Sequence, residues 1–243
     1  KEMLIKAYSK LNKESLKARS IEEPNATERN QYHRDFTRIL YSPSFRRLQG
    51  KMQILGIQND AFFRNRLTHS LEVSQIARDI ASNIGKIVGN GAYSADNDLY
   101  VIEAAALGHD LGHVPFGHTG EAILNEISLR VGEGYFNHNI QSVRTLMNVE
   151  NNGYGSNVTL QVLDAIMCHN GELELKEYRP KWKKTKEEFL NDYEMSYKDQ
   201  SVIKSFVPMT LEGCVVRISD IIAYIGRDIE DAIRMGIIKE YEV

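Results

Sequence analysis

The chain has 243 residues, of which 42% are hydrophobic and 26% charged, and its formal net charge is −3. These proportions are those of an ordinary globular protein, so they exclude a disordered chain, a collagen-like repeat and a coiled coil. The slightly acidic balance gives no overall basic surface for nucleic acid and leaves only a local basic patch open. The length fits one large domain, or one domain with a small annex, that buries a sizeable core.

Composition also indicates a cellular location. The two cysteines, Cys168 and Cys214, are too few for a disulfide framework and suit a reducing cytoplasm. No apolar run approaches the ~18 residues that a membrane span needs, and the opening residues lack the apolar core of a signal peptide. We therefore expect a cytoplasmic protein without a membrane partner. Because the chain does not begin with Met and ends within a helical pattern, we expect part of a longer protein, truncated at its C-terminus.

Helical periodicity dominates the sequence and is first clear in residues 69–88. Apolar side chains recur there on one side, with polar residues between them: Leu71, Ile76, Ala77, Ile80, Ile84 and Ile87. Asp96 or Asp98 can cap a second helix, which continues through Leu111 and has its end marked by Pro115.

Three further helices are expected at 137–149, 159–169 and about 210–235. The last one repeats apolar residues at steps of three and four, which predicts a stripe that faces the core: Leu211, Val215, Ile218, Ile222, Ile225, Ile229 and Ile233. No convincing run of alternating polar and apolar residues indicates a strand. The expected fold class is therefore all-α.

The segments between these helices are of two kinds. Residues 89–97, 131–136 and 150–157 are rich in Gly, Asn and Ser, which is typical of loops. None of them contains the GxGxxG pattern of a dinucleotide-binding loop. Residues 171–206 carry eight basic and eight acidic residues. This balance predicts a solvated surface insertion, with a mobile lid over a site as the less favoured alternative.

Three of the seven histidines fall within the segment 108–121, GHDLGHVPFGHTGE. Its first pair, His109 and Asp110, ends an apolar helix, where neighbouring residues point about 100° apart. Both can reach one metal ion near a helix end, but a divalent ion needs four to six ligands, and mixed His and carboxylate ligands suit Mn, Fe, Zn or Ni. The candidates for the remaining ligands are His69 and Asp220.

Asp220 by itself allows two interpretations. A carboxylate among isoleucines is costly unless it is paired or bound to a metal, but the residue also fits the polar side of an amphipathic helix. Tyr224 and Asp228 follow it on the same side and complete a stripe about 12 Å long at ~1.5 Å per residue. That length suits the sugar and phosphates of a nucleotide beside a metal ion. Spacing alone leaves a metal ligand and a surface carboxylate equally open.

His69, the pair His109–Asp110 and Asp220 resemble, in order and approximate separation, the ligand set of the HD superfamily of metal-dependent phosphohydrolases. Five longer segments resemble the deoxynucleoside triphosphate triphosphohydrolases, the dGTPase-like branch: 34–54, 65–78, 108–124, 136–146 and 217–232. The similarity runs from about residue 28 to the end and misses only the arm and the charged insertion.

The resemblance implies an architecture and a reaction. An HD-domain helical bundle with a metal site between its helices is expected over residues 31–243, with 171–206 as an insertion and residues 1–30 as an N-terminal arm. Water would add at the α-phosphorus of a dNTP, with dGTP the foremost substrate, to give a deoxynucleoside and intact triphosphate. The cofactor implied is a divalent metal ion, one of Mn, Fe, Zn, Ni or Mg.

Site roles follow from the resemblance residue by residue. His69, His109, Asp110 and Asp220 match the metal ligands. His118 and Glu121 match the catalytic histidine and its acidic partner, whose i, i+3 spacing lets the carboxylate hold the imidazole tautomer. His138 matches a further active-site histidine that contacts phosphate. His113 matches another pocket position, for which a purely structural role stays open.

Substrate-binding residues are implied as well. The only dense basic region of the chain lies at 34–51, and arginine side chains bind phosphate in a bidentate manner. From this region Arg47, and next to the first metal ligand Arg66, match phosphate-binding positions. Gln53 and Ile54 match positions that face the deoxyribose. In the last helix Tyr224 matches a substrate contact, and Asp228 completes the same stripe.

Some features depart from the family pattern or stay open. Ile221 follows the metal Asp, where some relatives carry a phosphate-binding Lys.

Two other functions remain: an HD phosphohydrolase of nucleoside monophosphates or signalling nucleotides, and a non-catalytic nucleotide-binding sensor or subunit. A homo-oligomer and an allosteric nucleotide are family expectations. We interpret His33, His169 and Cys168 as structural.

Overall fold

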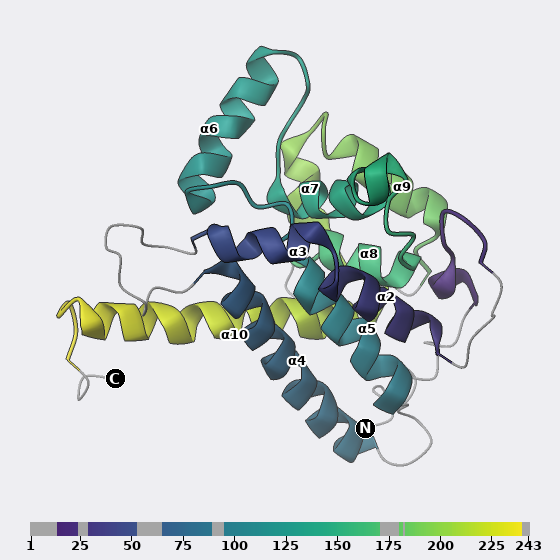
Figure 1. Cartoon of the computed structure of the whole chain (residues 1–243), viewed down its shortest axis with the longest axis horizontal. Coiled ribbons are helices and arrows are strands. Elements are labelled where there is room, and N and C mark those ends of the chain that lie inside the picture. The colour runs from purple at the N-terminus through teal and green to yellow at the C-terminus, as the bar shows by residue number, and fades with distance from the viewer. Residues whose placement is uncertain are drawn as a thin grey trace.

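The computed structural model describes residues 14–23, 29–52, 65–88, 95–170, 180–181 and 183–239. Its α-helices are α2 (Gln31–Leu40), α3 (Pro43–Arg47), α4 (Arg66–Val88), α5 (Ala95–Gly108), α6 (Gly117–Arg130), α7 (His138–Arg144), α8 (Leu160–Met167), α9 (Lys186–Met195) and α10 (Leu211–Arg234) (Figure 1). Short 3-10 or π turns add η1 (Glu14–Lys17), η2 (Leu48–Gly50), η3 (Thr145–Val149), η4 (Asn151–Gly153) and η5 (Gln200–Ser205). These ranges contain no β-strand, only the isolated bridge between Met52 and Asn65, so the all-α prediction is confirmed.

The predicted helices form where their periodicity indicated, and local caps set their ends. The helix expected at 69–88 begins three residues earlier, because the Asn65 side chain accepts a hydrogen bond from the Thr68 backbone at 3.0 Å. The second helix ends at Gly108 rather than beyond Leu111. As a consequence, His109 and Asp110 lie in a turn just past the helix end. Helices α2, α3, α6 and α9 were not delimited from the sequence.

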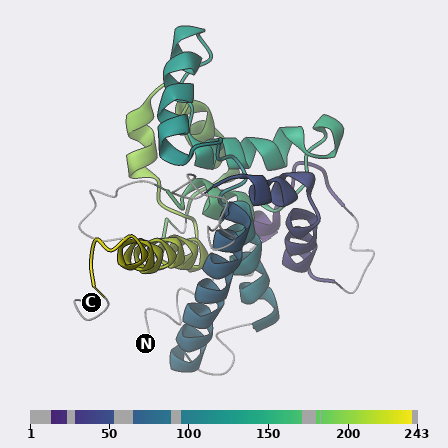
Figure 2. The same ribbon diagram turned by 60° about the vertical axis from the view of Figure 1, so that its left-hand side comes forward.

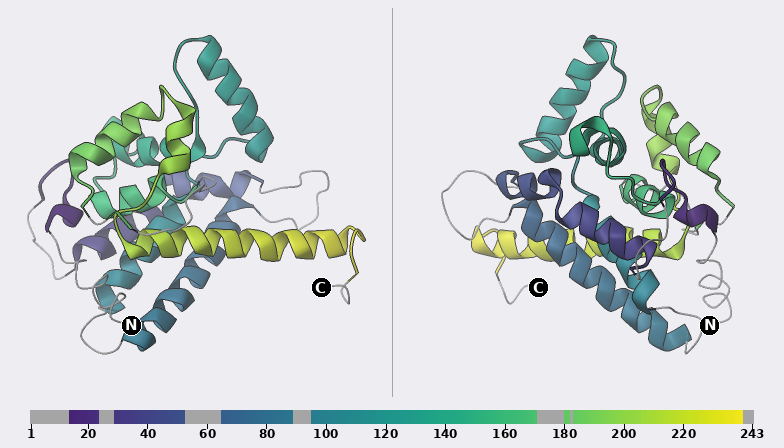
Figure 3. Two further views of the ribbon diagram at one scale, coloured as in Figure 1. Left: turned by 180° about the vertical axis from the view of Figure 1, so that it is seen from behind. Right: turned by 45° about the vertical axis from the view of Figure 1, so that its right-hand side comes forward.

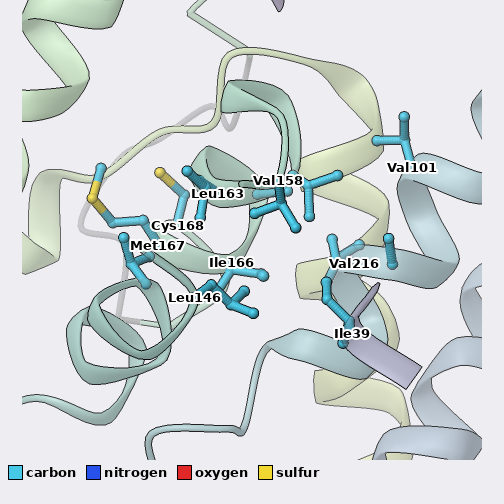
Figure 4. Packing of buried hydrophobic residues seen from close by; sticks show 14 of the residues in the cluster. Ile39, Val101, Leu146, Val158, Leu163, Ile166, Met167, Cys168 and Val216 are labelled. Atoms are coloured by element: carbon cyan, nitrogen blue, oxygen red, sulfur yellow. The ribbon is translucent and has the colours of Figure 1, made fainter. Parts of the chain in front are cut away.

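Helix α5 is the centre of the bundle. It contacts α2, α4, α8 and α10, and α4 runs beside it in both views of Figures 1 and 2. Its residues Ala104, Ala105 and Ala106 are fully buried, so small side chains let the neighbouring helices approach closely. Around it, Figure 4 shows side chains such as Ile39, Ile166 and Val216 gathered between the ribbons. None of the described helices is both long enough and apolar enough to cross a membrane.

The predicted core stripe of α10 is wrong over the outer part of the helix. Val215 is buried, but Ile218, Ile222 and Ile225 are 44%, 44% and 55% exposed. The reason is that α10 projects beyond the other helices, as both panels of Figure 3 show, so its outer turns have few neighbours. Where α10 crosses α4, the buried contact is made by Ala223. On α4, two residues of the predicted apolar side, Leu71 and Ile87, are exposed as well.

The charged segment is also only partly as predicted. Its first nine residues, 171–179, lie outside the described residues, but much of the rest packs into the core. Phe189 of α9 and Phe206 after η5 are buried. The Lys184 ammonium is buried too and forms ion pairs with Asp164 of α8, at 2.8 Å, and with Asp192, at 3.0 Å. Residues 184–206 are therefore a structural part of the domain rather than a solvated insertion.

Replacing Lys184 with alanine is expected to destabilise the fold by about 3–5 kcal/mol, because the carboxylate of Asp164, itself only 1% exposed, would lose its buried cation. The matched control is Lys183→Ala, which removes an exposed neighbouring charge and should change the free energy of unfolding by no more than about 0.5 kcal/mol. Denaturant unfolding of both variants measures this difference. Equal stability of the two variants would contradict the ion-pair anchor.

Candidate active site

The turn 109–113 between α5 and α6 forms the floor of the site. A close approach to α7 fixes it, because a Cβ atom on Gly112 would lie 2.2 Å from the His138 carbonyl oxygen and 2.3 Å from the Ser142 backbone nitrogen. Only glycine fits there. The Gly112 backbone donates a hydrogen bond to the Ser142 hydroxyl at 2.8 Å. This contact brings the histidines of the turn beside His138.

The four predicted metal ligands converge from three places in the fold. His69 comes from α4, His109 and Asp110 from the turn after α5, and Asp220 from α10. The Asp220 Oδ1 atom lies 2.9 Å from His69 Nε2 and 3.6 Å from His109 Nε2. His109 Nε2 is also 3.4 Å from Asp110 Oδ1. These separations suit ligand atoms that share one ion at about 2.0–2.2 Å.

The protonation of these groups also fits a metal ion. The His109 Nδ1–H donates to the Ala106 carbonyl oxygen at 2.7 Å, which orients the ring so that Nε2 lies near Asp110 and Asp220. That buried Nε2 has no hydrogen-bond partner in the described part of the chain. Burial would raise the pKa of Asp220, but the hydrogen bond from His69 and the neighbouring histidines lower it to about 2. Asp220 is therefore a deprotonated carboxylate, as a divalent ion requires, and it lies beside the unpartnered Nε2 of His109.

A cavity of about 300 Å³ opens over this ligand set. Its walls come from α4, the 109–113 turn, α6, α7 and α10, and its lining residues are Arg66, His69, Asp110, His113, His118, His138, Asn170, Asp220, Ile221, Tyr224 and Ile225. Arg66 is 2% exposed and donates to Asp110 Oδ2 at 2.7 Å. Its Nε and the second terminal nitrogen are buried, with no hydrogen-bond partner among the described residues. Arg66 thus combines a ligand contact with spare donors at the cavity wall.

A second group of ionisable side chains is formed by Glu121, His118 and His138. Glu121 of α6 faces His118 Nδ1 at 3.3 Å and His138 Nδ1 at 2.9 Å. Burial would raise the pKa of Glu121, but the hydrogen bonds from the two histidines outweigh it and hold the pKa well below its usual range. The hydrogen bond between His118 and Glu121 is the main cause that raises the pKa of His118. The pair is thus an ionised carboxylate and a histidine that retains its proton more readily than usual.

His113 lies between the predicted metal ligands and the group around Glu121. Its Nε2 atom is 3.4 Å from Asp110 Oδ1, and its ring stacks on that of His138 with centroids 3.8 Å apart. Burial, with the adjacent His138, lowers the pKa of His113 far below the ordinary value. His113 is therefore a neutral, buried ring between the metal ligands and the Glu121 group.

Comparison with protein-family models identifies the family to which this site belongs. The model of the HD domain matches residues 66–225, a range that contains all four predicted metal ligands. The chain belongs to the HD domain family. The buried His and Asp groups of this HD domain chain can hold a divalent metal ion, and the donor set fits one.

Individual relatives of the HD domain chain carry more specific names. It is 39% identical over 97% of its length to a deoxyguanosinetriphosphate triphosphohydrolase-like protein of Caldanaerobacter subterraneus subsp. tengcongensis. It is 40% identical over 95% of its length to the protein of the same name from Clostridium tetani, and 38% identical over 91% to deoxyguanosinetriphosphate triphosphohydrolase-like protein 2 of Vibrio cholerae. The chain spans about half the length of these relatives, 55%, 54% and 51% respectively.

Sequence reasoning missed one residue of the HD domain site. His169, interpreted as structural, is 3% exposed and lies just past α8, with its ring centroid 4.9 Å from that of His109. Its Nε2 atom is 3.3 Å from His138 Nε2. A signal was present, because His169 follows an apolar helix end (LDAIMCH) much as His109 does (EAAALGH).

Other predicted substrate residues are not brought into this cavity. Arg47 lines a separate cavity of about 710 Å³, formed with Arg38, Glu150 and the loop around Asn152. Asp228 is exposed on α10 and does not line the HD domain cavity. Their sequence positions could not reveal this, because the cavity that a side chain lines depends on how helices distant in sequence pack together. Gln53 and Ile54 lie outside the described residues.

Proposed function

We propose that the chain is the catalytic part of a metal-dependent dNTP triphosphohydrolase with dGTP as its preferred substrate. One observation carries the proposal: His118, which is hydrogen-bonded to Glu121, lines the same cavity as three of the four predicted metal ligands, His69, Asp110 and Asp220. A metal ligand set alone would fit many hydrolases. A histidine with a raised pKa beside it suits proton donation to a leaving oxygen. The names of the relatives support the choice of dGTP.

Each side chain has a defined task in this proposal. The metal, when bound to His69, His109, Asp110 and Asp220, lowers the pKa of a water molecule and offsets charge on phosphoryl oxygens. Arg66 directs its spare buried donors toward the phosphates. His118 donates its proton to the departing 5′ oxygen, and Glu121 holds the tautomer and orientation of that ring.

The α10 wall would hold the rest of the nucleotide. The Tyr224 ring stands edge-on to that of His69, with centroids 6.4 Å apart, and lines the cavity together with Ile221 and Ile225. Tyr224 and the two isoleucines give this part of α10 an aromatic and apolar surface. Such a surface suits the sugar and base rather than the phosphates.

Product identification tests the proposed function. The chain is incubated with each dNTP, each NTP and each dNMP, with Mn²⁺ or Mg²⁺. Deoxynucleoside and intact triphosphate from dNTPs, fastest from dGTP, are the expected products. Orthophosphate from a monophosphate would instead identify a different HD phosphohydrolase, and binding without turnover would identify a sensor. Comparing each dNTP with its NTP tests the proposed role of Gln53 and Ile54 in sugar choice.

Glu121→Gln is expected to move the basic limb of the kcat–pH profile to lower pH. The hydrogen bond from His118 to the Glu121 carboxylate raises the pKa of His118, so the ring keeps the proton it donates up to that raised pKa and loses it above. A neutral amide removes that stabilisation. Glu133→Gln, an exposed position after α6, is the matched control. An unmoved basic limb would contradict a role for Glu121 in holding this proton.

Assembly belongs to the same proposal. The family resemblance suggests a homo-oligomer and an allosteric nucleotide, and it assigns Arg47 to nucleotide contacts. The stripe on the last helix adds Asp228 to these contacts. Arg47 and Asp228 lie away from the HD domain cavity in one copy of the chain. Any nucleotide contact they make would therefore be outside this cavity. Measurement of molar mass with and without dNTP tests the oligomer.

A further inference from the structure

Glu121, His118 and His138 lie as close together as the ligands of a single metal ion. The Glu121 Oε2 atom is 3.3 Å from His118 Nδ1 and 3.0 Å from His138 Nδ1. In a tetrahedral site with bonds of about 2.0–2.1 Å, neighbouring ligand atoms are about 3.3 Å apart. An ion can therefore bind to these three side chains with only small shifts of their ligand atoms. None of the three belongs to the four predicted metal ligands.

A further histidine lies beside this group without completing it. The His113 ligand atom is within 4.8 Å of those of the other three, and the side chain is buried. However, its ring lies nearly parallel to that of His138, at 18° with centroids 3.8 Å apart, so the two rings do not direct their lone pairs at one ion. We therefore count three protein ligands, which leaves a fourth position for water. The Nδ1 atom of His113, which is buried without a hydrogen-bond partner among the described residues, is available to that water.

The donor atoms and their surroundings favour Zn²⁺ over harder ions. Two imidazoles and one carboxylate suit zinc, whereas Mg²⁺ prefers oxygen ligands. His118 is 62% exposed and lines the cavity, so an ion can reach the group from solvent. Three protein ligands, one of them exposed, should hold Zn²⁺ more weakly than the four predicted ligands of the first site. The group should therefore fill when Zn²⁺ is added and empty on dialysis.

We propose that Glu121, His118 and His138 form a second metal site, which binds Zn²⁺ and thereby inhibits the enzyme. The inhibition rests on the proposed function, in which His118 donates a proton to the leaving oxygen. Because Nδ1 of His118 faces Glu121, Nε2 is the nitrogen that donates. Zn²⁺ that binds at Nδ1 releases the proton of that atom to water. Loss of the remaining Nε2 proton would then produce an imidazolate, a far stronger base, so His118 no longer serves as the acid.

The number of bound Zn²⁺ ions tests the second site without any assay of activity. Titration with Zn²⁺ in competition with a chromophoric chelator should find two sites per chain in the wild type. Glu121→Gln and His118→Ala should retain the tighter site and weaken the other by more than about 10–100-fold, the effect of losing an outer partner of a ligand. Because His118 is exposed, its variant removes a ligand without disturbing the core. Glu133→Gln and Thr119→Ala, at exposed positions nearby, are the matched controls and should keep both sites.

Inhibition is measured as the loss of dGTP turnover when Zn²⁺ is added to the Mn²⁺-loaded protein. In the wild type, kcat should fall by about 10²–10⁴-fold, as for a lost general acid, and a chelator should restore it. Zn²⁺ that replaced Mn²⁺ at the first site would affect the wild type and Glu121→Gln equally. The remaining kcat of Glu121→Gln should instead change far less than that of the wild type over the same range of Zn²⁺ concentration.

Three results would overturn the proposal: a single Zn²⁺ site in the wild type, two sites of unchanged affinity in both ligand variants, or equal inhibition of the wild type and Glu121→Gln. If no dNTP is turned over with any metal ion, the proposed function fails. The number of Zn²⁺ sites in the wild type and the variants then still decides whether the second site exists.

Discussion

Replacing Asp220 with alanine is expected to remove the bound metal from the purified protein. Asp220 is the only one of the four predicted metal ligands that lies on α10, and its Oδ1 atom lies 2.9 Å from His69 Nε2 and 3.6 Å from His109 Nε2. Loss of an outer hydrogen-bond partner of a metal ligand already costs about 10–100-fold in affinity. The loss of a ligand itself should exceed that range.

Elemental analysis after extensive dialysis checks this prediction without any assay of activity. Asp228→Ala is the matched control, because Asp228 lies two turns further along the same helix and is exposed. The control should retain the wild-type metal content. If Asp220→Ala kept as much metal as Asp228→Ala, Asp220 would be an ordinary polar residue of α10 and the ligand set would be wrong.

Replacing His118 with alanine is expected to lower kcat by about 10²–10⁴-fold, the range typical of a lost general acid. The side chain is 62% exposed and its hydrogen bond runs to Glu121, so its removal leaves the core and the metal ligands intact. Metal content and dNTP affinity should therefore stay near the wild-type values. The effect is then confined to the chemical step.

The control for His118 is its neighbour Thr119, which is exposed on the same turn of α6. Thr119→Ala should leave kcat and KM unchanged. Steady-state kinetics with dGTP, together with equilibrium binding of the nucleotide, distinguish catalysis from binding. A His118→Ala variant within a few-fold of wild-type turnover would remove His118 from the mechanism.

The sequence by itself determined the fold class and predicted much of the candidate site. Helical periodicity needs only local information, so α4, α5, α7, α8 and α10 lie close to their predicted ranges. The adjacent pair His109–Asp110 at the end of an apolar segment indicated a metal site that distant residues must complete. The resemblance to known phosphohydrolases then named His69 and Asp220, which the fold brings within 4 Å of that pair.

Only the tertiary structure decided what covers each surface. A repeat of three and four residues identifies one side of α10, but burial depends on its neighbours, and the outer turns have few. Net charge could not reveal that Lys184 is buried, because its partner Asp164 lies twenty positions earlier in the chain. His169 was missed for the same reason: its contacts with His109 and His138 form only when α5, α7 and α8 pack together. Local patterns determine helices, whereas burial and charge pairing are set by residues distant in sequence.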